Sequence, residues 1–315
     1  MEGKITIGVS SCLLGEKVRY DGSHKHDGYV AGTLGAYFSY VSVCPEVECG
    51  MPTPREPIRL EGDPASPRLV TVKTRRDVTG QMLSYREARL EHLKDEDLCG
   101  YILKKDSPSC GLWRVKVYRG QGVVKSGSGM FAAGLMRQFP LLPVEEEGRL
   151  NDPKIRENFI ERVFSYKRWK DFLSDKPTSG KLVEFHTRHK LLLMAHSPQT
   201  YREMGKLVAR GGSLKFPELL HDYENMLMSG LAFFATAKKH TDVLMHIMGY
   251  FKKELSSPEK AEMLDLIGQY KSATLPLVVP LTLLRHYILK YDQQYLKNQV
   301  YLSPHPKELM LRNHV

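Results

Sequence analysis

The sequence lacks two features of secreted and membrane-bound proteins. Its most apolar stretch, residues 275–284, is short and is interrupted by Pro276 and Pro280, whereas a transmembrane helix needs about 20 apolar residues. The first residues, Met-Glu-Gly-Lys-Ile-Thr-Ile-Gly-Val, lead directly into a strand pattern, without the apolar region and small-residue cleavage site of a signal peptide. We therefore expect a cytoplasmic protein that does not contact a membrane.

Cysteine is also scarce. The chain has five cysteines in 315 residues, and a small, odd number in a reducing compartment argues against a disulfide framework and for metal binding or catalysis. The Cys-x₃-Cys-x₂-Cys spacing of radical enzymes is absent, as are internal repeats and low-complexity tracts.

The length and charge indicate two domains of different character. With 315 residues, 42% hydrophobic and 26% charged, the chain is long enough for two cores, which we place at residues 1–148 and 149–315, joined by an acidic linker at 142–153. Of the net charge of +10, residues 1–150 carry +2 (21 basic, 19 acidic) and residues 151–315 carry +8 (25 basic, 17 acidic). The basic second half predicts contact with a polyanion. The alternative is an ordinary basic surface that faces solvent, which would have the same net charge.

The pattern of apolar residues predicts an α/β domain followed by an all-α domain. Short apolar runs at 5–10, 40–43 and 101–103, and an alternating run at 113–118, are typical of strands, whereas 84–97 and 127–138 have helical spacing. Strands separated by helices favour a mostly parallel sheet with flanking helices. The second half has helical spacing almost throughout, in the segments 154–173, 180–195, 198–210, 216–238, 241–254, 258–272 and 281–300.

Three cysteines follow the ends of three predicted strands. Cys12 stands in Ser-Ser-Cys-Leu-Leu-Gly, Cys44 in Val-Cys-Pro-Glu and Cys110 in Ser-Pro-Ser-Cys-Gly. Because the carboxyl ends of parallel strands share one edge of a sheet, these thiols are expected to converge there. Three thiolates suit either a cubane iron–sulfur cluster with one open iron or a Cys₃ zinc site with one exogenous ligand. Cys49 and Cys99 lack this setting and are interpreted as packed thiols, with Cys49, five residues after Cys44, as the alternative candidate ligand.

Two further residue types near these cysteines are candidates for proton transfer. Glu46 follows Cys44 by two residues, so that its carboxylate can share the same cavity, although a glutamate in a turn also commonly caps backbone N–H groups. Ser107 and Ser109 bracket Pro108 beside Cys110, and either hydroxyl is suited to contact a substrate or to satisfy the turn.

Taken together, these motifs resemble the thiouracil desulfidase family. The likeness covers residues 4–145 and includes, in order, Ser-Ser-Cys-Leu-Leu-Gly, Arg-Tyr-Asp-Gly, Val-Cys-Pro-Glu, Met-Pro-Thr-Pro-Arg-Glu-Pro (51–57) and Ser-Pro-Ser-Cys-Gly. The helical remainder resembles a domain found fused to it in desulfidases that act on 4-thiouridine in tRNA. This sequence departs from the family pattern in carrying Cys49 and Phe131.

The resemblance implies a [4Fe–4S] cluster held by Cys12, Cys44 and Cys110, and catalytic roles for Glu46 and Ser109. The reaction would remove sulfur from free thiouracil or from 4-thiouridine in tRNA, leaving uracil or uridine and hydrogen sulfide. Our hypothesis is a non-redox hydrolysis in which the open iron acts as a Lewis acid. Glu46 would deprotonate the attacking water, and Ser109 would orient the water or the base.

The expected partner is tRNA or a thiolated nucleobase, and the sequence identifies no protein partner. The candidate RNA contacts in the basic half are Lys167, Arg168, Lys170, Arg188, Lys190, Lys238 and Lys239. Two other functions remain open at this point. One is a cluster- or zinc-dependent hydrolase of another small molecule, which would release no sulfide. The other is a non-catalytic RNA-binding protein with a structural metal, which would not need Glu46.

Overall fold

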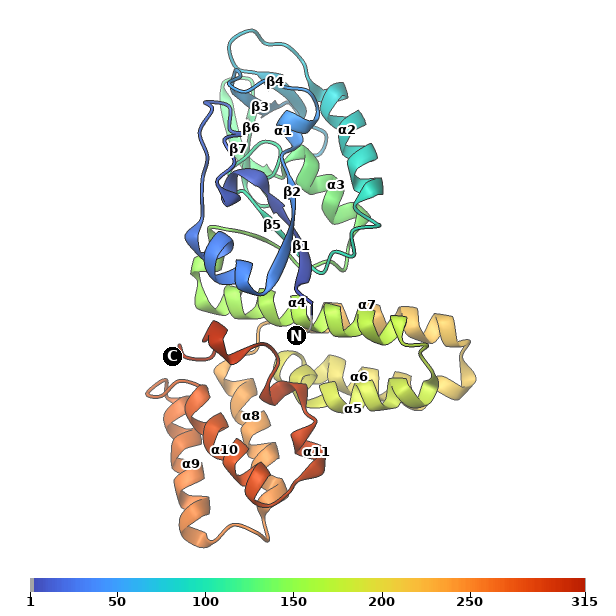
Figure 1. The fold of residues 1–315 in the computed structure, drawn as a ribbon, viewed down its shortest axis with the longest axis vertical. Helices are drawn as coiled ribbons and strands as arrows, with labels where there is room; N and C mark the ends of the chain where they lie inside the picture. The colour runs from blue at the N-terminus through green and yellow to red at the C-terminus, as the bar shows by residue number, and fades with distance from the viewer. Residues whose placement is uncertain (1–2, 315) are drawn as a thin grey trace. The chain divides into compact units, whose positions relative to one another are not determined.

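The computed structural model describes residues 3–314, and the chain divides into two compact units between Asp152 and Pro153. The first unit contains two four-stranded sheets with flanking helices, and the second is helical (Figure 1). The expected fold class, α/β followed by all-α, is therefore confirmed. No helix within the described range is both long and apolar enough to cross a membrane.

The first sheet positions the cysteines. Its strands are β1 (Ile5–Ser10), β2 (Phe38–Val43), β5 (Tyr101–Leu103) and β8 (Val144–Glu146). They are hydrogen-bonded in the order β2-β1-β5-β8, and every neighbouring pair is parallel. The carboxyl ends of the four strands consequently point in one direction. Gly8 of β1 allows the ring of Tyr101 to pack against the strand, because a Cβ at this position would lie 2.1 Å from that ring.

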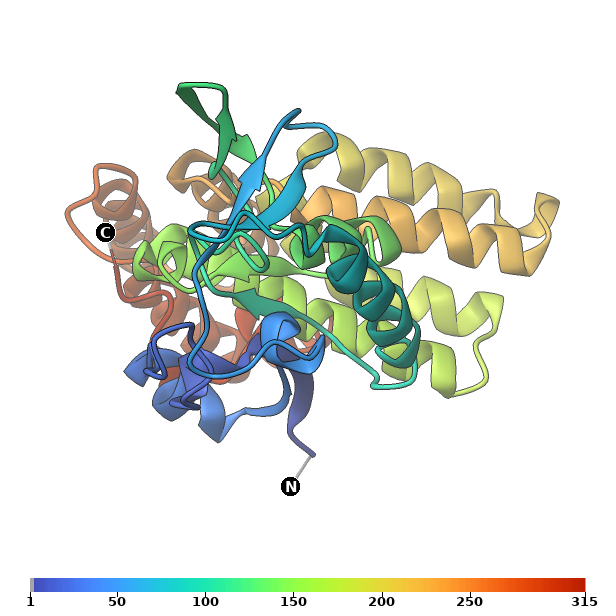
Figure 2. The same ribbon diagram turned by 90° about the horizontal axis from the view of Figure 1, so that it is seen from above.

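The second sheet is mixed, and the described part of the first unit also contains three α-helices. The sheet consists of β3 (Ile58–Glu61), β4 (Arg68–Thr71), β6 (Val115–Arg119) and β7 (Gly122–Gly127) in the order β4-β3-β6-β7, and only β3 and β6 pair in parallel. The helices are α1 (Pro45–Glu48), α2 (Thr79–His92) and α3 (Met130–Gln138). Helices α2 and α3 lie against each other, as both views show (Figures 1 and 2). Buried Leu60, Leu69, Met82 and Val117 form the core beneath this sheet.

The second unit is built from eight helices in the described range. They are α4 (Pro153–Ser174), α5 (Ser179–His196), α6 (Pro198–Ala209), α7 (Phe216–Leu231), α8 (Ala237–Met248), α9 (Ser257–Lys271), α10 (Val278–Lys290) and α11 (Gln294–Lys297). Trp169 of α4 is fully buried and packs on the rings of Phe172, Phe185 and Tyr223, at centroid distances of 5.0, 5.4 and 5.1 Å. Side-chain N-caps from Thr178, Ser197, Thr236 and Ser256 define the starts of α5, α6, α8 and α9.

Several predicted boundaries are wrong. The segment predicted as a linker, 142–153, contains β8, which completes the first sheet beside β5. The predicted helix 216–238 ends at Leu231, and α8 starts at Ala237, earlier than the predicted 241. The predicted helix 281–300 is interrupted after Lys290, because Asp292 adopts a left-handed conformation with φ of 50°. Strands β3, β4 and β7 were not predicted.

Candidate functional site

Three adjacent strand ends bring Cys12, Cys44 and Cys110 to one cavity. Cys12 lies in the short helical turn Ser11–Leu14 that follows β1, and Cys44 directly follows β2. Cys110 lies in the loop after β5. The cavity has a volume of about 180 Å³, and all three cysteines line it. Three parallel strands that are neighbours in the sheet therefore deliver three thiols to a single site, as their positions after the predicted strands suggested.

The surroundings of the thiols disfavour the free thiolate. Burial raises the pKa of Cys12 to about 11, with a further contribution from Cys44 nearby. Burial also raises the pKa of Cys44 and, more strongly, that of Cys110, to which Cys44, Glu46 and Cys12 add. Metals bind the thiolate, so a metal ion or cluster at this position would supply the positive charge that holds the three cysteines deprotonated. The donor set therefore fits a metal centre better than a free nucleophile.

The donor set suits two kinds of metal centre. A tetrahedral zinc ion binds three thiolates and one further ligand, with Zn–S bonds of about 2.3 Å. A cubane cluster binds each of three thiolates through a different iron and leaves its fourth iron open.

The loop that carries Cys110 is fixed by backbone hydrogen bonds. The Ser107 hydroxyl accepts from the N–H groups of Ser109 and Cys110 at 3.2 and 3.0 Å. The N–H groups of Met130 and Phe131, at the start of α3, donate to the carbonyls of Pro108 and Ser109, both at 3.0 Å. The first N–H groups of α3 are therefore used to hold the loop that carries Cys110.

Two acidic residues at the end of β8 and just after it support the same loop and two lysines of the cavity lining. Glu146 is buried and accepts from the N–H groups of Leu112 and Trp113 at 2.7 and 3.2 Å. Glu147 accepts from the Lys104 ammonium group at 2.5 Å and from the N–H of Lys105 at 2.8 Å. Both lysines line the cavity. The acidic residues that suggested a solvated linker thus serve as buried acceptors.

Glu46 lines the cavity and is held by donors on both carboxylate oxygens. The Ser109 hydroxyl donates to Oε1 at 2.9 Å. The Arg55 guanidinium donates to Oε2 through Nε at 2.9 Å and Nη2 at 2.5 Å. Arg55 also donates to the carbonyl of Val18 at 2.9 Å, and its side chain is 5% exposed. The result is a fixed carboxylate beside the three thiols.

The two serines differ in position, and one residue of this site was not anticipated. Ser107 lines the cavity, whereas Ser109 is fully buried behind it and reaches the site through Glu46. Arg55 belongs to the motif Met-Pro-Thr-Pro-Arg-Glu-Pro, and no role in the site was predicted for it. Arg55 lies nine residues after Glu46, and this spacing does not indicate an ion pair between the two side chains. The ion pair forms because the segment that contains Arg55 folds back toward Glu46.

The remaining cysteines and Phe131 lie away from the cavity. Cys49 is partly buried, and its Sγ lies 3.2 Å from the carbonyl oxygen of Glu46. Cys99 is fully buried. Phe131 is also fully buried and packs on Tyr101, with a distance of 6.1 Å between the ring centroids. None of the three belongs to the residues that line the cavity.

The predicted RNA contacts fall into two groups. Lys167 pairs with Asp171, Arg168 donates to the carbonyl of Pro304, and Lys239 donates to the carbonyls of His196 and Phe234. These side chains therefore also contribute to helix packing. Arg188 and Lys238 are exposed, whereas Lys170 and Lys190 are half-buried, so that Arg188 and Lys238 present their charge to solvent most directly.

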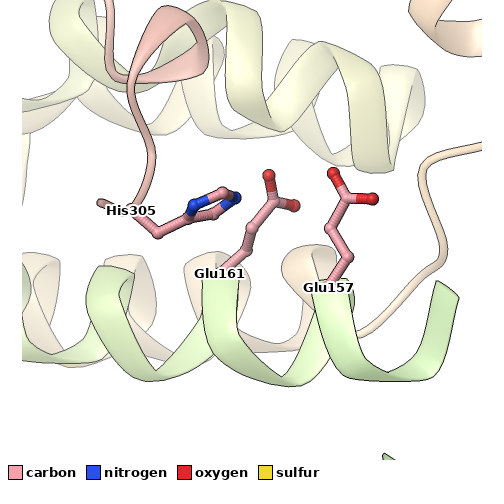
Figure 3. Close-up of side chains that lie close together, drawn as sticks. All are labelled: Glu157, Glu161 and His305. Atoms are coloured by element: carbon pink, nitrogen blue, oxygen red, sulfur yellow. The ribbon is translucent and has the colours of Figure 1, made fainter. Parts of the chain in front are cut away.

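A second group of potential metal ligands lies in the helical unit. Ligand atoms of Glu157, Glu161 and His305 lie within 4.8 Å of one another (Figure 3). However, Arg312 donates to Glu161 at 2.7 Å and to Glu157 at 3.2 Å, and His196 lies 2.9 Å from the second oxygen of Glu161. The buried guanidinium already supplies the positive charge at this position. We interpret the group as a structural ion-pair network.

Comparison with known proteins separates the same two units. Residues 7–147 match the family model described as 2-thiouracil desulfurase, and residues 190–306 match one described as a protein of unknown function (DUF1722). Uncharacterized protein YbbK of Bacillus subtilis is 32% identical over 149 residues, which are 46% of this chain and 97% of YbbK. Uncharacterized protein YbgA of Escherichia coli is 29% identical over 165 residues, 52% of this chain and 98% of YbgA.

Among solved structures, the [4Fe-4S]-dependent thiouracil desulfidase TudS is 35% identical and covers 47% of this chain and 95% of its own, with a TM-score of 0.40. The parallel sheet with three cysteines at its carboxyl edge, together with the family match and the similarity to YbbK, defines the class of protein. This chain belongs to the 2-thiouracil desulfurase family.

Proposed function

We propose that this protein is a desulfidase that removes sulfur from a thiolated uracil, either free thiouracil or 4-thiouridine in tRNA. The products are uracil or uridine and hydrogen sulfide. The observation that carries the proposal is the convergence of Cys12, Cys44 and Cys110 on one cavity that also contains Glu46. The name of the family, 2-thiouracil desulfurase, supports the same substrate class.

We propose further that Cys12, Cys44 and Cys110 hold a [4Fe–4S] cluster. The convergence of the three thiols on one cavity supports this ligand set. A cubane with three protein ligands supplies an iron with an open coordination position, which is a Lewis acid suited to a thiocarbonyl sulfur. The overall change is a hydrolysis: water replaces the C=S bond by C=O, the sulfur leaves as hydrogen sulfide, and no electrons are gained or lost.

The protein's own residues then handle the water and its protons. Glu46 accepts a proton from the water that attacks the base, because its carboxylate faces the cavity. Ser109 and Arg55 act as positioning residues, since they contact Glu46 on opposite oxygens and hold it in one orientation. The cations at the cavity, Lys104 and Lys105 among them, suit the negative charge that develops on the attacked base.

For the helical unit we propose binding of tRNA through its basic surface. Residues 151–315 carry a net charge of +8. Binding of a polyanion to such a surface is favourable because the polyanion releases its counterions. Exposed Arg188 and Lys238 support this role most directly. Lys167, Arg168, Lys170, Lys190 and Lys239 complete the proposed contacts.

The proposal is tested with protein purified without oxygen. The full chain is incubated with 2-thiouracil, 4-thiouracil and tRNA that contains 4-thiouridine, and sulfide is measured together with the desulfurated product. We expect sulfide and uracil or uridine in equal amounts from at least one substrate, without an added reductant. Protein that retains its iron and releases no sulfide from any of the three would contradict the proposal.

A further inference from the structure

The helical unit contains a cavity of its own, with a volume of about 210 Å³. Glu157 of α4, His240 of α8 and Tyr270 of α9 contribute polar wall, and Ala237 and Leu277 contribute apolar wall. The cavity is smaller than the range of about 300–1,000 Å³ that is typical of organic ligand sites. It therefore suits one small ring system rather than a larger molecule.

Two buried polar groups at this cavity have no hydrogen-bond partner among residues 3–314. Tyr270 is 8% exposed, and its hydroxyl contacts no donor or acceptor of the protein. His240 is 4% exposed and uses Nδ1 for a hydrogen bond of 2.9 Å with the Tyr301 hydroxyl, which leaves Nε2 unused. Because buried polar groups are almost always paired, we expect a molecule in the cavity to pair with these two.

The polar groups of the cavity suit a neutral ligand that both donates and accepts hydrogen bonds. Burial lowers the pKa of His240 to about 3, so that its imidazole is neutral, and a phenol hydroxyl can donate or accept. Glu157 projects from α4 beside Glu161 (Figure 3), and Arg312 donates to both carboxylates. No large net charge therefore remains for an ionic ligand to neutralise. The edge of a nucleobase presents the required mixture of donors and acceptors.

Two consecutive phenylalanines are exposed beside this cavity. Phe233 and Phe234, in the connection between α7 and α8, are 57% and 45% exposed, and Phe234 lines the cavity. The carbonyl of Phe233 accepts from Asn158 at 3.2 Å and lies 2.7 Å from Nδ1 of His196. The carbonyl of Phe234 accepts from Lys239 at 2.9 Å. The two rings consequently face solvent from a fixed backbone.

The surroundings of these rings are basic. Exposed Lys154 lines the cavity, and exposed Lys238 directly follows Ala237 in the cavity wall. Residues 151–315 together carry a net charge of +8. Exposed aromatic rings among basic side chains are the combination that binds single-stranded nucleic acid, because bases stack on the rings while the cations contact the phosphates.

We propose that this cavity binds an unpaired base of RNA, which stacks on Phe234 and pairs through its polar edge with Tyr270 and His240. The inference rests on the proposed binding of tRNA by the helical unit, and it assigns to that unit a site for one base. A base within a duplex is already paired and stacked, so the contribution of Phe234 should be confined to single strands.

The test measures binding of RNA that contains no sulfur, so it does not depend on desulfidation. Fluorescence anisotropy with the full chain, purified without oxygen, compares a labelled single-stranded oligoribonucleotide of mixed sequence with the duplex form of the same RNA, at several salt concentrations. The variants are Phe234→Ala and Tyr270→Phe, which removes only the unpaired hydroxyl. The control Leu289→Ala truncates an exposed apolar side chain of α10 away from the cavity lining. Circular dichroism checks that each variant is folded.

We expect Phe234→Ala to weaken binding of the single strand about tenfold, as for loss of one stacked base, and to leave binding of the duplex unchanged. The slope of log K against log salt should stay the same, because no phosphate contact is lost. Tyr270→Phe should weaken binding of the single strand about threefold through loss of one hydrogen bond. Leu289→Ala should change neither affinity.

An effect of Phe234→Ala no larger than that of Leu289→Ala overturns the inference, as does an equal loss of affinity for the single strand and the duplex. A wild-type dimer that Phe234→Ala dissociates, with RNA affinity unchanged, would assign the exposed rings to a second copy of this chain and also overturns it. In both cases the proposed desulfidase is unaffected. Absence of sulfide release from thiolated substrates, with Phe234-dependent binding of the single strand intact, would instead count against the proposed desulfidase alone.

Discussion

The side chain of Glu46 has a fixed donor on each oxygen, and these donors come from distant parts of the first unit. Ser109 belongs to the loop after β5, and Arg55 to the segment before β3. Neither needs to touch the substrate to affect the reaction. A general base is effective when its free lone pair points at the proton that it removes. Residues that hold the base in this orientation therefore affect the rate of proton transfer.

Removing the charge of Glu46 is expected to stop the reaction without loss of the metal centre. Glu46→Gln keeps the shape and the contact with Ser109 but cannot accept a proton, so that kcat should fall by about 10²–10⁴-fold. The measurement is sulfide release together with iron content. Glu87→Gln, an exposed carboxylate of α2, serves as the control. Unchanged kcat in Glu46→Gln would assign the base to another group.

Replacing Arg55 by lysine is expected to slow the reaction rather than abolish it. Lysine keeps the charge but cannot reproduce the two hydrogen bonds that Nε and Nη2 of Arg55 make to Glu46. We expect kcat to fall about tenfold, as expected from loss of one charge-assisted contact, with iron content retained. A lower iron content with normal kcat per cluster would show that Arg55 stabilises the fold and does not position Glu46.

At the scale of secondary structure, the start of α3 determines where Cys110 lies. Gly129 approaches the cysteine loop so closely that an added Cβ would lie 2.4 Å from the carbonyl of Ser109. The N–H of Gly129 donates to the carbonyl of Gly111 at 2.7 Å. The glycine is therefore needed for packing, since its φ of −61° is available to any residue.

Gly129→Ala is expected to displace the Cys110 loop. Overpacking of this kind costs about 1–3 kcal/mol, so we expect a lower melting temperature and reduced iron content after reconstitution. Gly80→Ala is the matched control, because no atom lies within 4 Å of the added Cβ, and alanine favours the helix α2 in which it lies. Full iron content and an unchanged melting temperature in Gly129→Ala would contradict this role.

The elements that carry the cysteines could be predicted from the sequence, whereas the elements that support them could not. Strands β1 and β5 are apolar runs, and the predicted bounds of both match the structure. Strand β8 has the sequence Val-Glu-Glu, and its acidic residues suggested solvent. It is a strand because it pairs in parallel with β5, and the carboxylates of Glu146 and of Glu147, the next residue, accept from N–H groups in loops that are distant in sequence. Such tertiary pairings have no local signal.

The site shows the same limit for single residues. The positions of Cys12, Cys44 and Cys110 after three predicted strands indicate a shared edge of the sheet, because parallel strands end together. The ion pair between Arg55 and Glu46, and the separation of Ser107 from Ser109 by the cavity wall, depend on loop conformation. Sequence spacing contains no information on either.

For the molecule as a whole, stability is expected to fall in acid because the helical unit buries neutral histidines. Burial lowers the pKa of His186 and His305 to about 4 and that of His189 and His240 to about 3. The unfolded chain protonates these histidines near pH 6.5, but the folded chain does not. Stability is therefore full above about pH 6.5 and is lost as the pH falls toward 4.

The expected loss is on the order of 1–2 kcal/mol per buried histidine at pH 5. Thermal unfolding followed by circular dichroism at 222 nm should show a clearly lower midpoint at pH 5 than at pH 7.5. His189→Leu should reduce the difference, because it removes one of these groups, whereas His246→Gln, at an exposed position of α8, should not. Equal midpoints at the two pH values would contradict this account.

The central claim is that Cys12, Cys44 and Cys110 hold the cluster on which desulfidation depends. The most direct test measures iron, acid-labile sulfide and sulfide release in the same samples of protein purified without oxygen. The comparison includes the wild type, the Cys12→Ser, Cys44→Ser and Cys110→Ser variants, and Cys49→Ser as the control. We expect about four irons per chain in the wild type and the control, and loss of both iron and activity in each of the other three. Zinc in place of iron, or full iron content and activity in any one of the Cys12→Ser, Cys44→Ser and Cys110→Ser variants, would contradict the account.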